Sequence, residues 1–113
     1  MDSNRMESFA DFWPFYLGEH RHPANRLLHF IGTSAALACW VGFIVTLQPL
    51  WVLLGLFIGY GCAWVGHFFI ERNRPASFNY PLWSFVADWR MWALMLTGRL
   101  NAELARLAHL QER

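Results

Sequence analysis

The fold is decided by residues 30–70, which read FIGTSAALACWVGFIVTLQPLWVLLGLFIGYGCAWVGHFFI and contain no charged residue. A membrane-spanning helix needs about 20 apolar residues, and this run holds two such lengths on either side of Gln48-Pro49. Proline interrupts a helix, and the uncharged connection is short enough for a tight helical hairpin. The run therefore predicts two antiparallel membrane-spanning helices, over residues 30–47 and 50–70.

The composition supports an integral membrane protein. The chain has 113 residues, of which 56% are hydrophobic and 15% are charged, whereas about 25% are charged in a typical soluble domain. A soluble protein of this size has too much surface to bury so many apolar side chains. The formal net charge of +1 gives no electrostatic footprint for nucleic acid, so we expect no nucleic-acid partner. We predict one membrane-embedded domain over residues 1–113.

Further helices are predicted on both sides of the hairpin. Residues 5–19 place aromatic side chains at helical spacing, which is typical of a helix in the membrane interface. Pro23 suits the first turn of the next helix, so we expect a break at residues 21–23. The fold class is therefore all-α: a membrane hairpin with flanking amphipathic or interfacial helices, four to five helices in all.

Residues 81–98 form a third apolar segment, which contains Asp88 and Arg90. Charges at mid-bilayer depth are costly, so we expect a partly embedded or tilted helix, or a span packed tightly on the hairpin. The sequence leaves that choice open. Residues 99–113 predict an amphipathic helix with an Arg99–Glu103 pair one turn apart.

Arginines predict the orientation. They lie before the first span and after the second, at Arg5, Arg21, Arg26, Arg72 and Arg74. The turn between the spans has none. Because positive residues favour the cytoplasmic side, both outer helix ends should face the cytoplasm.

Four of the five histidines gather at this cytoplasmic end. His29 opens the first span and His67 closes the second, so an antiparallel hairpin brings both to one membrane level. His20 and His22 lie just before the break at Pro23. Neutral imidazole is a common ligand for iron and zinc, and the convergence predicts a metal site.

Two polar residues accompany these histidines. Asn25 lies one helical turn before His29, and Glu71 lies one turn after His67. Glu71 could bind the metal directly or hold His67 as a hydrogen-bond acceptor. The spacing leaves two other interpretations open: histidines that only anchor the helix ends in the interface, as in a non-enzymatic lipid-binding or assembly protein, and a bis-histidine haem protein.

Two blocks of sequence resemble a known family. They are Tyr16 with His20-x-His22-Pro23-x-Asn25-x-x-x-His29, and Gly66-His67-x-x-x-Glu71-x-x-Arg74-Pro75-Ala76. They resemble the small membrane family of 2-hydroxy fatty acid dioxygenases, and the resemblance covers residues 12–98. A single hairpin joins the blocks, so the chain looks like a compact bacterial-type member, expected in the bacterial inner membrane.

The resemblance implies an enzyme that uses Fe(II) and O₂ to shorten a 2-hydroxy fatty acid by one carbon, a step of fatty acid α-oxidation. It implies that His20, His29 and His67 bind the metal, with Asn25 and Glu71 as catalytic residues assigned by geometry. We expect Arg26, Arg72 or Arg74 to receive the substrate carboxylate. The expected partners are a fatty-acyl substrate, O₂ and membrane lipids. Whether the chain forms a homo-oligomer is left open.

Overall fold

The chain is all-helical in the computed structural model, which describes residues 5–111. It folds as two compact units. The hairpin unit comprises His20–Pro75, and the flanking unit comprises the chain up to Glu19 and from Ala76 onward. The predicted all-α class is confirmed, because the described residues form five α-helices and two short helices of other types and contain no strand.

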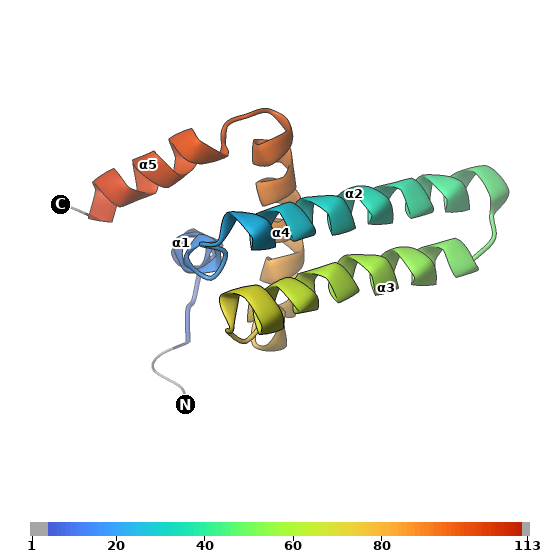
Figure 1. The fold of residues 1–113 in the computed structure, drawn as a ribbon, viewed down its shortest axis with the longest axis horizontal. Helices are drawn as coiled ribbons and strands as arrows, with labels where there is room; N and C mark the ends of the chain where they lie inside the picture. The colour runs from blue at the N-terminus through green and yellow to red at the C-terminus, as the bar shows by residue number, and fades with distance from the viewer. Residues whose placement is uncertain (1–4, 112–113) are drawn as a thin grey trace. The chain divides into compact units, whose positions relative to one another are not determined.

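The hairpin unit is built on the antiparallel pair predicted from the sequence. Helix α2 spans Pro23–Thr46 and helix α3 spans Leu50–Val65, and a short turn joins them (Figure 1). Pro23 occupies the first turn of α2, as predicted, and His22 caps it by accepting the N–H of Ala24 on Nδ1 at 3.1 Å. Beyond α3 the chain continues as the π-helix η1, Gly66–Glu71.

Small residues let α2 and α3 approach closely. A Cβ atom on Gly32 would lie 2.8 Å from Cβ of Cys62, and one on Gly55 would lie 2.6 Å from the indole nitrogen of Trp40. That indole N–H donates to the carbonyl of Val52 at 3.3 Å. Side chains of the opposite helix therefore fill the space beside these glycines.

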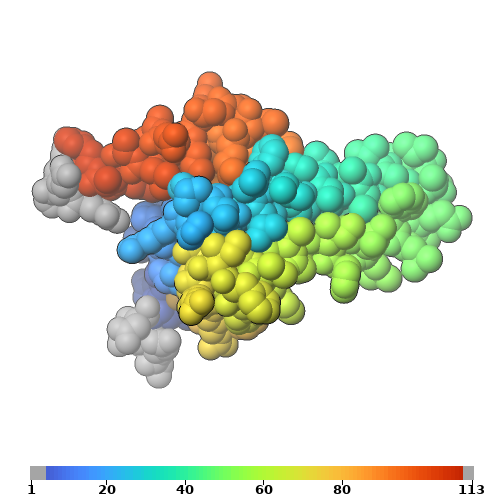
Figure 2. Space-filling view, in the orientation of Figure 1, coloured from blue at the N-terminus to red at the C-terminus, as the bar shows by residue number. Residues whose placement is uncertain are grey.

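The outer surface of the hairpin is apolar. Both α2 and the continuous stretch Leu50–Glu71 are long and apolar enough to cross a membrane, and only 22% and 17% of their most apolar windows are buried. A core helix of a soluble protein would be mostly buried. Val45, Phe57 and Phe69 expose 76%, 77% and 76% of their surface. Figure 2 shows α2 and α3 in contact along the hairpin, with the side chains of both helices at its surface.

The flanking unit contains α1 (Phe9–Gly18), the short helix η2 (Ala76–Phe78), α4 (Pro81–Leu96) and α5 (Leu100–Gln111). Helix α1 begins four residues later than expected, because Ser8 caps it by accepting the N–H of Asp11 at 3.2 Å. The buried core of the unit consists of Phe12, Trp13, Tyr16, Leu17, Ala76, Ala87, Met91 and Leu100. The aromatic face of α1 thus packs inside this unit.

The charges in the third apolar segment have partners within the flanking unit. Tyr16 donates its hydroxyl hydrogen bond to Asp88. The guanidinium of Arg90 lies 4.5 Å from the ring centre of Trp13 and 3.7 Å from a carboxylate oxygen of Glu103. Asp88 therefore has a partner on α1, and Arg90 has partners on α1 and α5. Neither side chain is left in the unit without an interacting group.

Glu103 joins α5 to the rest of this unit. It accepts the indole N–H of Trp13 at 2.7 Å and two N–H groups of Arg106 at 2.8 and 2.9 Å. The predicted pair with Arg99 is wrong, because Glu103 pairs with Arg106 and Arg90 instead. Chiefly through the Arg106 hydrogen bonds, the fold lowers the pKa of Glu103 from 4.5 to about 2.

We expect Glu103→Gln to lower the melting temperature at pH 7 by a few degrees, because the amide loses both ion pairs. The lowered pKa means that the carboxylate stabilises the wild type fully above pH 4.5, and that this contribution is lost as the pH falls towards 2. The variant should lack that part of the acid dependence in thermal unfolding followed by circular dichroism in detergent. The exposed Glu7 supplies the matched control, Glu7→Gln, and equal curves for the two variants would contradict the prediction.

Candidate metal centre

Three buried histidines of the hairpin unit converge on one point. His20, His29 and His67 expose 1%, 5% and 2% of their surface, and each offers a ring nitrogen within 4.8 Å of the others. The Nε2 atoms of His20 and His67 lie 3.0 Å apart. The three rings are nearly perpendicular, with centroids 4.4 to 5.1 Å apart.

Chain geometry explains the convergence. His29 lies in the second turn of α2, and His67 is the second residue of η1. Because α2 and α3 are antiparallel, the end of α3 lies beside the beginning of α2 (Figure 1). His20 precedes the break that Pro23 imposes, so its ring is free of the helical register of α2.

The close approach of η1 to α2 depends on Gly66. A Cβ atom at this position would lie 1.8 Å from Oδ1 of Asn25 and 3.6 Å from Cα of Asn25. Asn25 is fully buried, so its side chain fills the space that a Cβ would occupy. This contact brings the neighbouring His67 to the level of the first turns of α2.

The cluster fits a metal ion. Two metal–nitrogen bonds of about 2.1 Å at a right angle place their nitrogens about 3 Å apart, which matches the separation of the His20 and His67 Nε2 atoms. Oδ1 of Asn25 is buried without a hydrogen-bond partner among the residues described, and such an atom usually marks a place for water or a ligand. Three neutral imidazoles suit iron, zinc or copper.

The same geometry disfavours a bis-histidine haem. Two axial nitrogens lie on opposite faces of the porphyrin and, with bonds of about 2 Å each, are about 4 Å apart. The His20 and His67 nitrogens are closer than that, and the ring of His29 lies 4.4 Å from that of His20. A macrocycle would have to separate these rings.

Glu71 lies beside the cluster but outside the group of three ligand atoms. Its carboxylate accepts the backbone N–H of His22, and its Oε1 lies 3.5 Å from Nδ2 of Asn25, at the limit of a hydrogen bond. Glu71 therefore ties the end of η1 to the start of α2. In η1 the hydrogen bonds run to the fifth residue, so the α-helical spacing assumed for His67 and Glu71 does not apply.

The three arginines expected to receive a carboxylate also belong to the hairpin unit. Arg26 lies three residues before His29 and is half-buried, whereas Arg72 and Arg74 follow η1 and are exposed. His22 is exposed and lies outside the cluster; it caps α2. His109, on α5, is likewise exposed.

One residue of the site was missed in the sequence. Oδ1 of Asn73 lies 2.7 Å from Nδ1 of His67, where an acceptor can orient the imidazole of a metal-binding histidine. The only signal was an amide side chain inside the second motif block. Its role depends on the π-helix, which hydrophobic periodicity does not reveal.

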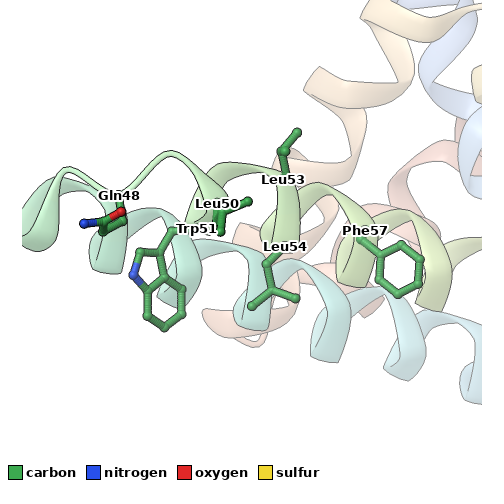
Figure 3. A pocket seen from close by; sticks show the side chains of 6 residues that line it. All are labelled: Gln48, Leu50, Trp51, Leu53, Leu54 and Phe57. Carbon is green, nitrogen blue, oxygen red and sulfur yellow. The ribbon is translucent and has the colours of Figure 1, made fainter.

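A separate groove lies at the other end of the hairpin, near its turn (Figure 3). It has a volume of about 570 Å³ and is lined by Gln48, Leu50, Trp51, Leu53, Leu54 and Phe57. Apart from the amide of Gln48 and the indole N–H of Trp51, the lining is apolar, and it contains no titratable group. It is not a candidate active site.

Comparison with known protein families identifies a match over most of the chain. A family model described as 2-hydroxy-palmitic acid dioxygenase Mpo1-like matches residues 6–100. Neither the curated proteins nor the solved structures give a match. The matched range contains all three histidines of the cluster.

We expect Gly66→Ala to lower the free energy of unfolding by about 1–3 kcal/mol, because the added methyl group overpacks the contact with Asn25. Chemical denaturation in detergent measures this loss. Gly61→Ala is the matched control on α3: nothing lies within 4 Å of its Cβ position, and alanine is favoured over glycine in a helix. Equal destabilisation by both substitutions would show that the Gly66 contact is unimportant.

Proposed function

Because the chain belongs to the 2-hydroxy-palmitic acid dioxygenase Mpo1-like family, we propose that it is an Fe(II)- and O₂-dependent membrane enzyme that shortens a 2-hydroxy fatty acid by one carbon. The observation that carries the proposal is the group of three buried histidines whose ligand atoms lie within 4.8 Å of one another. The reaction balances as R–CH(OH)–COOH + O₂ → R–COOH + CO₂ + H₂O. The C1–C2 bond breaks, and O₂ takes up four electrons.

His20, His29 and His67 are the proposed ligands. Together these three histidines would hold the iron, which would supply the reduction of O₂ and a Lewis acid for the oxygen atoms of the substrate. Burial of all three rings excludes bulk water from the site, which protects reactive species from side reactions.

Asn25 and Glu71 are proposed to maintain the geometry of the site. Glu71 accepts the backbone N–H of His22, which fixes the segment that carries His20 against the end of η1. Asn25 is fully buried between Gly66 and Glu71, so its side chain sets the separation of α2 and η1 beside the cluster. Neither side chain needs to bind the metal for these roles.

The substrate is proposed to bind with its carboxylate at the arginines and its chain in the bilayer. Arg26, Arg72 and Arg74 offer guanidinium groups that can hold a carboxylate through two parallel hydrogen bonds. The apolar outer surface of α2 and α3 gives the acyl chain a lipid-like path, since the space beside the glycines between the helices is filled. We propose that the hairpin spans the bacterial inner membrane with this end on the cytoplasmic side, as the arginines indicate.

We expect His67→Ala to reduce the bound iron to less than about a tenth of the wild-type content and the release of shortened acid at least about a hundredfold, because one of three ligands is lost. Elemental analysis of detergent-purified protein, together with mass spectrometry of products from 2-hydroxypalmitate, measures both. His109→Ala, at the exposed histidine on α5, should leave both unchanged.

Full activity of His67→Ala would contradict the proposal. A wild-type protein that takes up no metal and releases no product would instead favour the non-enzymatic lipid-binding alternative, in which the histidines serve only the structure.

We expect Arg26→Gln to raise the KM for 2-hydroxypalmitate about tenfold while the iron content stays constant, because one charge-assisted hydrogen bond to the carboxylate is lost. Arg72→Gln and Arg74→Gln test the other two candidates in the same assay. Arg99→Gln is the control from the flanking unit. An unchanged KM in all three hairpin variants would refute carboxylate binding by these arginines.

A further inference from the structure

The hydrogen bonds of His67 single out Asn73. We propose that Asn73 is a positioning residue, whose side-chain carbonyl holds His67 in the tautomer that presents an unprotonated Nε2 to the other two histidines. The inference rests on the proposed metal site for its purpose, but the hydrogen bond and the tautomer are properties of this chain alone. Three features of the hairpin unit support it.

The first is the chemistry of the contact. Oδ1 of Asn73 lies 2.7 Å from Nδ1 of His67. An amide oxygen can only accept a hydrogen bond, so the proton must be on Nδ1 of the imidazole. In a neutral ring Nε2 then carries a lone pair. That atom lies 3.0 Å from Nε2 of His20, so the lone pair faces the centre of the cluster.

The second feature is the backbone around the contact. The N–H groups of Arg72 and Asn73 both donate to the carbonyl of His67, that of Asn73 at 3.0 Å. Asn73 therefore holds His67 twice, through its backbone at the carbonyl and through its side chain at the ring. Such an arrangement restricts both the position of His67 and the rotation of its imidazole.

The third feature is the conformation of Arg72, which makes this double contact possible. Arg72 has φ 57° and ψ 43°, a left-handed conformation that is unfavourable for a residue with a side chain. This conformation turns the chain back towards the helix it has just left. Because Arg72 is not a glycine, this conformation is strained. The contacts of the next residue, Asn73, with His67 maintain the turn.

Asn73 takes the role that the sequence suggested for Glu71. The carboxylate of Glu71 is directed to the backbone N–H of His22 and towards Asn25, while the amide of Asn73 meets the imidazole. A neutral acceptor fixes the tautomer without adding a negative charge beside the site. Partners of this kind orient metal-binding histidines, and their loss typically lowers metal affinity about 10- to 100-fold.

The experiment compares Asn73→Leu, which keeps the size but removes the acceptor, with Asn73→Asp, which keeps the acceptor. Nitrogen-15 NMR of metal-free, histidine-labelled protein at a pH where imidazole is neutral reports which nitrogen of His67 carries the proton. The His67 signals are assigned by their loss in His67→Ala. Fe(II) affinity is measured anaerobically by competition with a chelator. Asn101→Ala, at an exposed residue of α5, is the control.

We expect the wild type and Asn73→Asp to carry the proton on Nδ1, and Asn73→Leu to shift it to Nε2. Asn73→Leu should bind Fe(II) about 10- to 100-fold more weakly, and Asn73→Asp should bind it at least as tightly as the wild type. A wild-type proton on Nε2, or an unchanged tautomer or Fe(II) affinity in Asn73→Leu, would overturn the inference. Wild-type protein that binds no Fe(II) would refute the proposed function, and the tautomer would then still decide whether Asn73 orients His67.

Discussion

At Gly66 the hairpin leaves no space for a side chain, because the amide of Asn25 occupies it. This contact joins the end of the second long helix to the first turn of α2, and the histidine cluster lies beside it. Glu71 strengthens the same junction through the backbone N–H of His22. The position of all three histidines therefore depends on how closely two backbones approach at this one level.

A π-helix begins at the same residue, Gly66. Its hydrogen bonds run to the fifth residue rather than the fourth, which changes the side chains that face α2. Glu71 faces the start of α2, and the chain turns at Arg72 so that Asn73 meets His67. Single-turn π-helices occur often at functional sites. Here the irregular turn gives Glu71 and Asn73 different partners: Glu71 binds the backbone of His22 at the start of α2, and Asn73 contacts the imidazole of His67.

Much of this arrangement could be predicted from local rules. The two apolar runs, Gln48-Pro49 and Pro23 predict an antiparallel hairpin, which brings His29 and His67 to the same end of the two helices. The close contact at Gly66 then sets their level. The partners of individual side chains could not be predicted, because they depend on tertiary contacts. Glu103 meets Arg106 rather than Arg99, and the role of Asn73 follows from a helix type that no periodicity reveals. The candidate metal ligands were identified by convergence and resemblance, whereas the residue that orients one of them was found only in the three-dimensional structure.

The hairpin unit and the flanking unit differ in where they place charged side chains relative to apolar segments. In the hairpin unit the charged side chains are confined to one end, and the remaining length is uncharged. In the flanking unit Asp88 interrupts an apolar helix, and burial raises the pKa of its carboxyl to about 7. Near neutral pH this group is therefore protonated in a large fraction of molecules, and Tyr16 supplies a hydrogen bond to the ionised form. Because the carboxyl can bind a proton, the cost of burying Asp88 against α1 is limited to the free energy of protonating it near neutral pH, which is smaller than that of a permanent buried charge.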